Sequence, residues 1–336
     1  MSSHLRGDSV ITRRSVLLAG GIGLLVAHRL SRGQPAATIR RVGWLSFGSK
    51  GSAHVYAAFK QGMHDLGWLE GKNVQYQFVY ADGDVDRLGA LAGELVGRNV
   101  EVIICGNALA TRAAQRATKT IPIVMVYVGN PVGNGFVASL ANPGGNITGM
   151  TQQPEDVLGK LIGILHEIVP GARRIAILLN ESNPNYPVFW GAAQRACSAL
   201  DLVALRVLAG APAQFGAAVE QIVRQGSQAV VVVVDPVYLD ERVKLQALMQ
   251  TTRLPVAYAF REQVVAGGLL SYSTDLAASF RDAAKYVDKI LKGAKPGDLP
   301  VAQPTKFELV INLKTAKDLG LTIPQSVLVR ADDVIQ

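Results

Sequence analysis

Short apolar runs alternate with stretches of helical spacing along most of this chain. The runs are rich in β-branched residues and cover residues 42–46, 74–80, 102–105, 122–127, 175–179, 203–208, 230–234 and 256–259. Between them, apolar residues recur every three or four positions, as in residues 55–66, 84–97 and 158–168. This spacing predicts amphipathic helices. Because parallel strands must be joined by crossover connections, strands that alternate with helices predict parallel α/β sheets.

The second half of the chain repeats the layout of the first. Residues 121–127 (IPIVMVY) reappear as residues 254–260 (LPVAYAF), an offset of 133 positions. Residues 41–47 and 174–180 stand at about the same offset and open the two halves. The repeat predicts an α/β fold with two doubly wound parallel-sheet lobes and a ligand cleft between them.

The repeat also predicts which segments form each lobe. We expect lobe one to comprise residues 40–150 plus about 270–300, and lobe two residues 151–268 plus about 305–336. Three crossovers between the lobes are expected near residues 147–153, 264–272 and 296–306. Residues 267–272 read as a strand returning to lobe one, and the helical stretch 276–291 would pack there.

Residues 1–33 have the pattern of a signal peptide. Residues 12–18 (TRRSVLL) resemble the twin-arginine export pattern, and small residues precede a cleavage position after Gly33. The apolar stretch 16–27 is too short to span a hydrocarbon core of about 30 Å. Export to the periplasm with removal of this segment is the prediction, and an uncleaved N-terminal anchor is the alternative.

Charge and cysteine usage narrow the class of protein. The net charge is +8, and half of it comes from the five arginines and one aspartate of residues 1–33. The rest of the chain has no Lys/Arg-rich block, so we expect no nucleic-acid partner. Cys105 and Cys197 fall in different lobes, which favours two small buried residues over a disulfide.

The sequence carries no pattern typical of catalysis. None of the five histidines forms a metal-spaced pair, and no nucleotide-binding or nucleophile motif follows a strand. We therefore expect no catalytic residues, no metal and no cofactor.

Three motifs carry a family resemblance. They are residues 140–149 (LANPGGNITG), 267–272 (GGLLSY) and 304–316 (PTKFELVINLKTA). With them, the chain from residue 40 to 336 resembles the ABC-transporter substrate-binding proteins of the tryptophan/tyrosine-binding type. The resemblance implies a periplasmic binding protein type I fold, an extracytoplasmic location and delivery of a small solute to a membrane permease.

Ligands of open α/β sheets bind beyond the carboxyl ends of the strands. That rule selects the loops 46–51, 106–109, 128–132, 180–187, 235–238 and 260–263. Asp235 follows the valine run and can pair with a ligand ammonium group or cap the next helix. Asn107 and Ala108 begin a helix whose N–H groups can accept a carboxylate, although Asn107 can equally be only the cap. Ser46 and Gly48 allow close approach to the backbone.

Further candidates come from the remaining loops and from the expected hinge. The ligand-binding candidates there are Asn130, Asn185, Tyr186, Tyr258, Glu262 and Tyr272. The tyrosines can pack on an apolar group of the ligand, with core or rim packing as the alternative. Glu262 can contact the ligand or pair with a neighbouring base.

These features predict a monomeric solute-binding protein of an ABC importer. Its partners would be a small solute, an amino acid or a related organic molecule, and a permease in the inner membrane. Capture would occur by hinge closure without covalent chemistry. The alternatives are an enzyme that uses the same cleft and the ligand-sensing domain of a signalling system.

Overall fold

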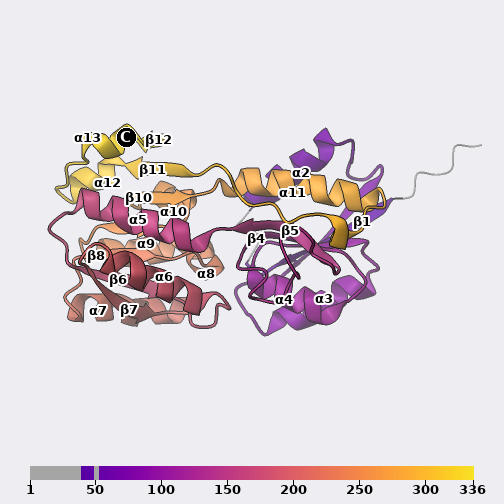
Figure 1. Ribbon diagram of the computed structural model, residues 1–336, viewed down its shortest axis with the longest axis horizontal. Coiled ribbons are helices and arrows are strands. Elements are labelled where there is room, and N and C mark those ends of the chain that lie inside the picture. The colour runs from indigo at the N-terminus through magenta and orange to yellow at the C-terminus, as the bar shows by residue number, and fades with distance from the viewer. Residues whose placement is uncertain (1–38, 49–52) are drawn as a thin grey trace, which may run out of the picture. The chain divides into compact units, whose positions relative to one another are not determined.

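The structure, a computed structural model, describes residues 39–48 and 53–336 (Figure 1). The expected signal peptide and its cleavage position lie outside the described residues. Residues 39–336 form one compact unit with two sheets. In the described ranges, no helix is both long enough and apolar enough to cross a membrane.

Lobe one is built on a five-stranded sheet with the strand order β2-β1-β3-β4-β5. Its strands all pair in parallel, and they are β1 (Arg40–Ser46), β2 (Val74–Tyr80), β3 (Val102–Cys105), β4 (Ile123–Gly129) and β5 (Ile147–Gln152). The helices between them are α2 (Ala53–Asp65), α3 (Arg87–Gly97) and α4 (Ala108–Ala117). Every residue of β4 is buried, as expected for a parallel strand covered on both faces.

Lobe two is built on a seven-stranded sheet with the order β12-β11-β10-β9-β8-β6-β7. The strands are β6 (Arg174–Leu179), β7 (Val203–Leu208), β8 (Ala229–Val232), β9 (Val256–Tyr258), β10 (Leu270–Ser273), β11 (Glu308–Asn312) and β12 (Asp333–Ile335). Only the β10–β11 pair among them is antiparallel. The helices are α6 (Tyr186–Ser198), α7 (Phe215–Arg224), α8 (Pro236–Asp240), α9 (Arg242–Gln250), α10 (Arg261–Val265), α12 (Leu313–Asp318) and α13 (Gln325–Leu328), with 3₁₀ turns at Pro212–Gln214 and, in lobe one, Pro296–Asp298.

The repeat in the sequence is a repeat in the topology. The order β7-β6-β8-β9-β10 in lobe two matches β2-β1-β3-β4-β5 in lobe one. The helix after the fifth strand of each repeat packs in the opposite lobe. Helix α5 (Pro154–Ile168) packs on α6, β9 and β10, whereas α11 (Leu276–Leu291) packs on α2, β4 and β5. The predicted fold class, two parallel-dominated α/β lobes, is confirmed.

Two features differ from the expectation. The strand expected to return to lobe one is β10, and it stays in lobe two between β9 and β11. Leu269 and Leu270 are buried in lobe two, and β10 pairs with both neighbouring strands. The chain therefore leaves lobe two after Ser273, the last residue of β10. Lobe two also carries the additional strands β11 and β12. The lobes therefore share a five-strand plan without being identical.

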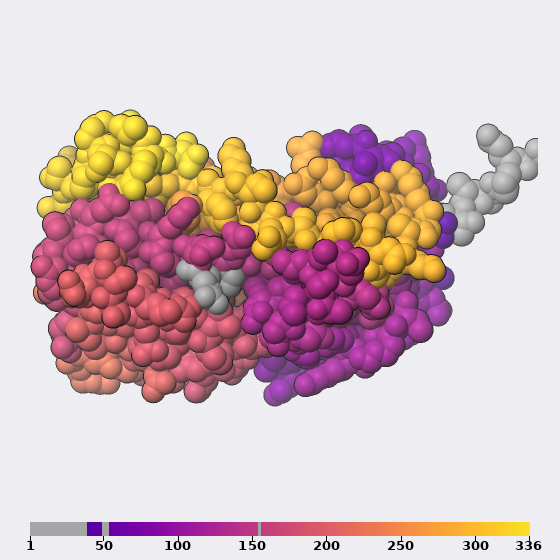
Figure 2. Space-filling model, viewed as in Figure 1, coloured from indigo at the N-terminus to yellow at the C-terminus, as the bar shows by residue number. Residues whose placement is uncertain are grey.

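The third crossover runs back along one side of the molecule, in orange and yellow in Figures 1 and 2. Its lobe-one end is tied to the sheet, because the Ala302 amide donates to Gly149 O at 2.9 Å and the Thr151 amide donates to Ala302 O at 2.9 Å. Its other end leads into β11 of lobe two. The first connection between the lobes follows β5, the second follows β10, and the third leads into β11.

Candidate functional site

A cavity lies between the lobes, beyond the carboxyl ends of strands from both sheets. Half a dozen aromatic residues line it: Trp44, Tyr56, Tyr127, Phe189, Phe260 and Phe280. Its polar lining side chains are Ser46, Asn107, Gln152, Asn183, Asn185 and Asp240. An apolar wall with a few polar groups is typical of a small-molecule site.

Trp44 lies at the centre of the aromatic contacts on the lobe-one side of the cavity. Its ring meets Tyr56 edge-on at 4.7 Å between centroids and stacks on Phe280 at 5.1 Å. The Tyr56 hydroxyl donates to Ser46 Oγ at 3.0 Å. Burial raises the pKa of Tyr56 well above its ordinary value, so the hydroxyl stays neutral. This wall can pack on a flat apolar group of a ligand.

The two repeats meet in one aromatic pair inside the cavity. Tyr127 and Phe260 are the last residues of the repeated seven-residue run, and their rings lie 5.6 Å apart. Tyr127 comes from lobe one and Phe260 from lobe two, so this contact joins the lobes. Both side chains line the cavity.

The N-terminus of α4 provides the polar end of the lobe-one wall. Asn107 is its N-cap, with Oδ1 accepting from the Ala110 amide at 2.9 Å. Ala108 and Leu109, the first helical residues, line the cavity. The first N–H groups of a helix have no intrahelical acceptor, and the helix dipole favours an anion there. A ligand carboxylate suits this position.

A chain of asparagines forms the polar side of lobe two. Asn183 donates to Asp235 Oδ2 at 2.8 Å and accepts from the Asn185 amide at 2.9 Å. The Asn134 side chain of lobe one donates to Asn185 Oδ1 at 2.8 Å. The chain therefore reaches from the carboxylate of Asp235 to the opposite lobe.

Asp240 is the charged residue among the described residues that line the cavity. Its carboxylate lies against the backbone of Gly48, because a Cβ at position 48 would stand 1.9 Å from Asp240 Oδ2. A larger residue at position 48 would displace the carboxylate. Asp240 brings a negative charge to the place where the lobes approach each other.

Five of the residues predicted from the sequence lie together at the cavity: Ser46, Gly48, Asn107, Ala108 and Asn185. Asp235 does not line it. Its side chain is fully buried, caps α8 through the Val237 amide at 2.9 Å, and accepts from Asn180 at 3.2 Å and from Asn183. The capping alternative therefore describes its geometry, and it reaches the cavity only through Asn183.

The other predicted residues point elsewhere. Asn130 accepts from the Gly133 amide at 3.1 Å, and the Tyr186 hydroxyl accepts from Arg206 at 3.1 Å. Tyr258 is buried in lobe two against Gln246. Tyr272 stacks on Phe307 at 5.7 Å. Glu262 pairs across the lobes with His54, with 2.7 Å between Oε1 and Nε2.

The residues predicted from the sequence include none of the six aromatic residues of the cavity, nor Asp240. Tyr127 and Phe260 could have been found, because they end the repeated run at the carboxyl ends of their strands. Trp44 and Phe280 had no such signal, since each lies inside a strand or helix pattern that reads as core.

The described part of the chain contains no group of three or more residues able to ligate a metal. Cys105 and Cys197 are buried and unpaired with each other. Burial raises the pKa of both thiols, which leaves them protonated and unreactive.

The chain is similar in sequence and fold to known proteins. The tyrosine-binding protein of Clostridioides difficile (strain R20291) is 23% identical over 263 residues, covering 78% of this chain and 75% of that protein. The crystal structure of an ABC domain in complex with L-Trp from Streptococcus pneumonia is 25% identical, with a TM-score of 0.83, and covers 89% of this chain and 100% of that one.

A conserved domain protein from Vibrio cholerae is similar to the same degree. It is 26% identical with a TM-score of 0.84, and the match covers 88% of this chain and 100% of that one. Residues 49–335 match the family described as ABC transporter substrate binding protein. The chain belongs to the ABC transporter substrate binding proteins.

Proposed function

We propose that this protein captures an α-amino acid with a large, preferably aromatic, side chain and delivers it to an ABC permease. The observation that carries the proposal is the composition of the cavity: an aromatic wall, a helix N-terminus and, among the described residues, the carboxylate of Asp240. Two relatives at 23% and 25% identity are named for tyrosine and for L-Trp, which agrees with this composition.

Each part of a zwitterionic ligand has a partner in the cavity. The α-carboxylate fits the N-terminus of α4, and the α-ammonium fits Asp240. The side chain would pack among Trp44, Tyr56 and Phe280.

Capture proceeds by hinge closure in this proposal. The lobes would separate about the three crossovers, admit the ligand, and close so that water leaves the cavity. Polar contacts strengthen in the drier closed cavity. The protein would act outside the cytoplasm as a monomer, after export directed by Arg13 and Arg14, and dock on a permease.

The proposal is tested by calorimetric titration of the purified protein with L-Trp, L-Tyr, L-Phe and L-Leu. Two matched probes each lack one charged group of L-Trp. Tryptamine lacks the carboxylate, and indole-3-propionate lacks the ammonium group. We expect L-Trp or L-Tyr to bind without chemical change and both probes to bind at least tenfold more weakly. Equal binding of indole-3-propionate, binding of none of the amino acids, or formation of a product would contradict the proposal.

A further inference from the structure

Asn185 is a buried residue whose side-chain amide has one end without a protein partner. The residue is 3% exposed and lines the ligand cavity. Its backbone amide donates to Asn183 Oδ1 at 2.9 Å, which fixes it to the polar wall of lobe two. Its side-chain Oδ1 accepts from Asn134 of lobe one at 2.8 Å. Among the described residues, none accepts a hydrogen bond from Asn185 Nδ2, so this donor remains for a ligand.

The orientation of this amide is set from the opposite lobe. Asn134 Nδ2 donates to the Gly129 carbonyl at 3.0 Å and to Asn185 Oδ1 at 2.8 Å. A carbonyl oxygen only accepts, so the atom of Asn134 that lies between these two groups must be its nitrogen. The atom of Asn185 that meets this nitrogen is then the oxygen. The two hydrogen bonds together leave the donor end of Asn185 for the cavity.

The loop that carries Asn134 is held in place within lobe one. Arg112 of α4 donates to the Asn134 carbonyl at 2.5 Å, and Gln115 donates to the Gly135 carbonyl at 2.7 Å. The Arg112 guanidinium also lies over the Phe136 ring, 4.5 Å from its centroid. Because these contacts do not involve lobe two, they preorganise Asn134 for its contact with Asn185. A preorganised group loses little conformational freedom when the contact forms.

The N-terminus of α4 provides the other half of a carboxylate site. Ala108 and Leu109 line the cavity from lobe one, and Asn185 lines it from lobe two. A carboxylate accepts at both oxygens, so one oxygen can bind the helix N-terminus while the other binds Asn185 Nδ2. An ammonium group only donates and cannot pair with Asn185 in this orientation. The amide therefore favours a ligand that carries an acceptor at this point.

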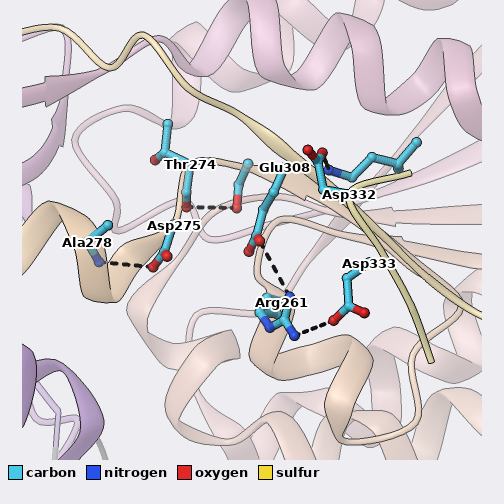
Figure 3. Close-up of polar contacts among 9 residues, drawn as sticks. Arg261, Thr274, Asp275, Ala278, Glu308, Asp332 and Asp333 are labelled. Atoms are coloured by element: carbon cyan, nitrogen blue, oxygen red, sulfur yellow. Dashed lines mark hydrogen bonds and ion pairs between the residues drawn. The ribbon is translucent and has the colours of Figure 1, made fainter. Parts of the chain in front are cut away.

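A second polar cluster, at the crossovers, has its charged groups paired with one another. Figure 3 shows Asp275 accepting from the Ala278 amide of α11, and Arg261 between Glu308 and Asp333. None of these five residues is in the described lining of the ligand cavity. The cluster therefore provides a reference for changes that affect the crossovers without touching the ligand.

We propose that Asn185 recognises the carboxylate of the ligand, and that Asn134 sets this specificity by holding the amide with its donor end toward the cavity. Contact between the lobes and recognition of an acceptor are then made by the two ends of one side chain. Asn134 is a positioning residue, because it acts on the ligand only through Asn185. The inference rests on the proposed capture of an amino acid and explains how an amine without a carboxylate is rejected.

The test compares the affinities of L-Trp and of tryptamine, which lacks the carboxylate, by calorimetric titration. Asn134→Asp replaces the donor by an acceptor of nearly the same shape. The Asn185 amide must then turn its nitrogen toward the new carboxylate and present its oxygen to the ligand. We expect L-Trp to bind at least tenfold more weakly and tryptamine at most threefold more weakly.

A double-mutant cycle separates the charge of the new carboxylate from the turn of the amide. Asn185→Ala alone should weaken L-Trp binding about tenfold and leave tryptamine binding within threefold. When Asn134→Asp is added to Asn185→Ala, the ratio of the two affinities should change by less than threefold, because no amide remains to turn. Asn134→Ala brings no charge and should lower L-Trp affinity less than Asn134→Asp does. It also provides the measurement if Asn134→Asp does not fold.

Glu308→Gln is the matched control at the crossovers. It weakens the pair with Arg261, whose atoms lie 3.4 Å apart, and leaves Asn134 and Asn185 as they are. Any effect on closure of the lobes acts on both ligands, so the ratio of the L-Trp and tryptamine affinities should stay that of the wild type.

An unchanged ratio of the two affinities in Asn134→Asp overturns the inference. So does an equally large fall of the ratio when Asn134→Asp is made in the Asn185→Ala background. In both cases, binding of L-Trp by the wild type leaves the proposed function standing. A wild-type protein that binds none of the amino acids overturns the proposed function and this inference together.

Discussion

The buried carboxylate of Asp235 holds two asparagine side chains beside the cavity. It accepts from Asn180, Asn183 and the Val237 amide, and none of its surface is exposed. Burial raises the pKa of Asp235 to about 6, although these hydrogen bonds oppose the shift. The carboxylate therefore orders the polar wall that Asn183 presents to a ligand.

Asp235 should make the stability of the protein depend on pH. Between its ordinary pKa and about 6, the folded protein binds more protons than the unfolded chain, so stability rises as pH falls through this window. Relative to Asp235→Asn, the wild type should gain about 1 kcal/mol of unfolding free energy between pH 7.5 and pH 5. Urea denaturation of both proteins at the two pH values measures this difference.

The same variant separates a supporting role from a direct one. If Asp235 acts only through Asn183, Asp235→Asn should weaken L-Trp binding by less than tenfold. A larger loss with no change in the pH dependence of stability would mean that the carboxylate meets the ligand itself.

The side-chain level was the least accessible to sequence reasoning. The rule for parallel sheets identifies the loops that reach the cavity, and Ser46, Gly48, Asn107 and Asn185 of these loops line it. It does not say which way a side chain points. Tyr186 lies one residue from Asn185 but turns to Arg206, because the first turn of a helix distributes consecutive residues over different faces.

Helices α2 and α11 pack against each other. A Cβ at Gly62 of α2 would lie 2.5 Å from Arg281 O and 2.9 Å from Ala284 Cβ. Glycine at this position lets the backbones of the two helices approach. The contact fixes α11, which arrives from the second crossover, to lobe one.

Gly62→Ala should destabilise the protein by about 1–3 kcal/mol, because neither the carbonyl nor the neighbouring Cβ can move without parting the helices. Gly93→Ala is the matched control. Gly93 is exposed in α3 with no atom within 4 Å of an added Cβ, so the same substitution should stabilise the protein by about 0.5–1 kcal/mol. Thermal and urea denaturation of both variants check the signs, and destabilisation by both would argue against a packing cause.

Element type and order followed from hydrophobic periodicity, since apolar runs and helical spacing are local signals. The placement of β10 could not be predicted in this way. The buried residues Leu269 and Leu270 are compatible with a strand in either of the two sheets. Strands β11 and β12 lie outside the repeat, so the repeat could not predict their place beside β10.

At the scale of the whole molecule, polar side-chain contacts of two different physical kinds join the lobes among the described residues. His54 Nε2 and Glu262 Oε1 lie 2.7 Å apart, and Asn134 donates to Asn185 at 2.8 Å. Burial raises the pKa of Glu262, but the hydrogen bond and charge of His54, with the charge of Arg242, bring it below its ordinary value. The lowered pKa favours the ionised form of Glu262 in this structure.

When His54 is protonated, Glu262→Gln should weaken L-Trp binding by two- to fivefold at low salt, because a partly exposed ion pair contributes up to about 1 kcal/mol to closure. The loss should shrink as salt is raised from about 0.02 to 0.5 M, since the Debye length falls from about 20 Å to about 4 Å and solvent-exposed charges are screened. Asn134→Ala removes the uncharged contact, so its loss of affinity should be the same at both salt concentrations. Calorimetric titrations measure the loss of L-Trp affinity in each variant at both salt concentrations. Equal salt sensitivity in both variants would mean that the His54–Glu262 pair does not hold the lobes together.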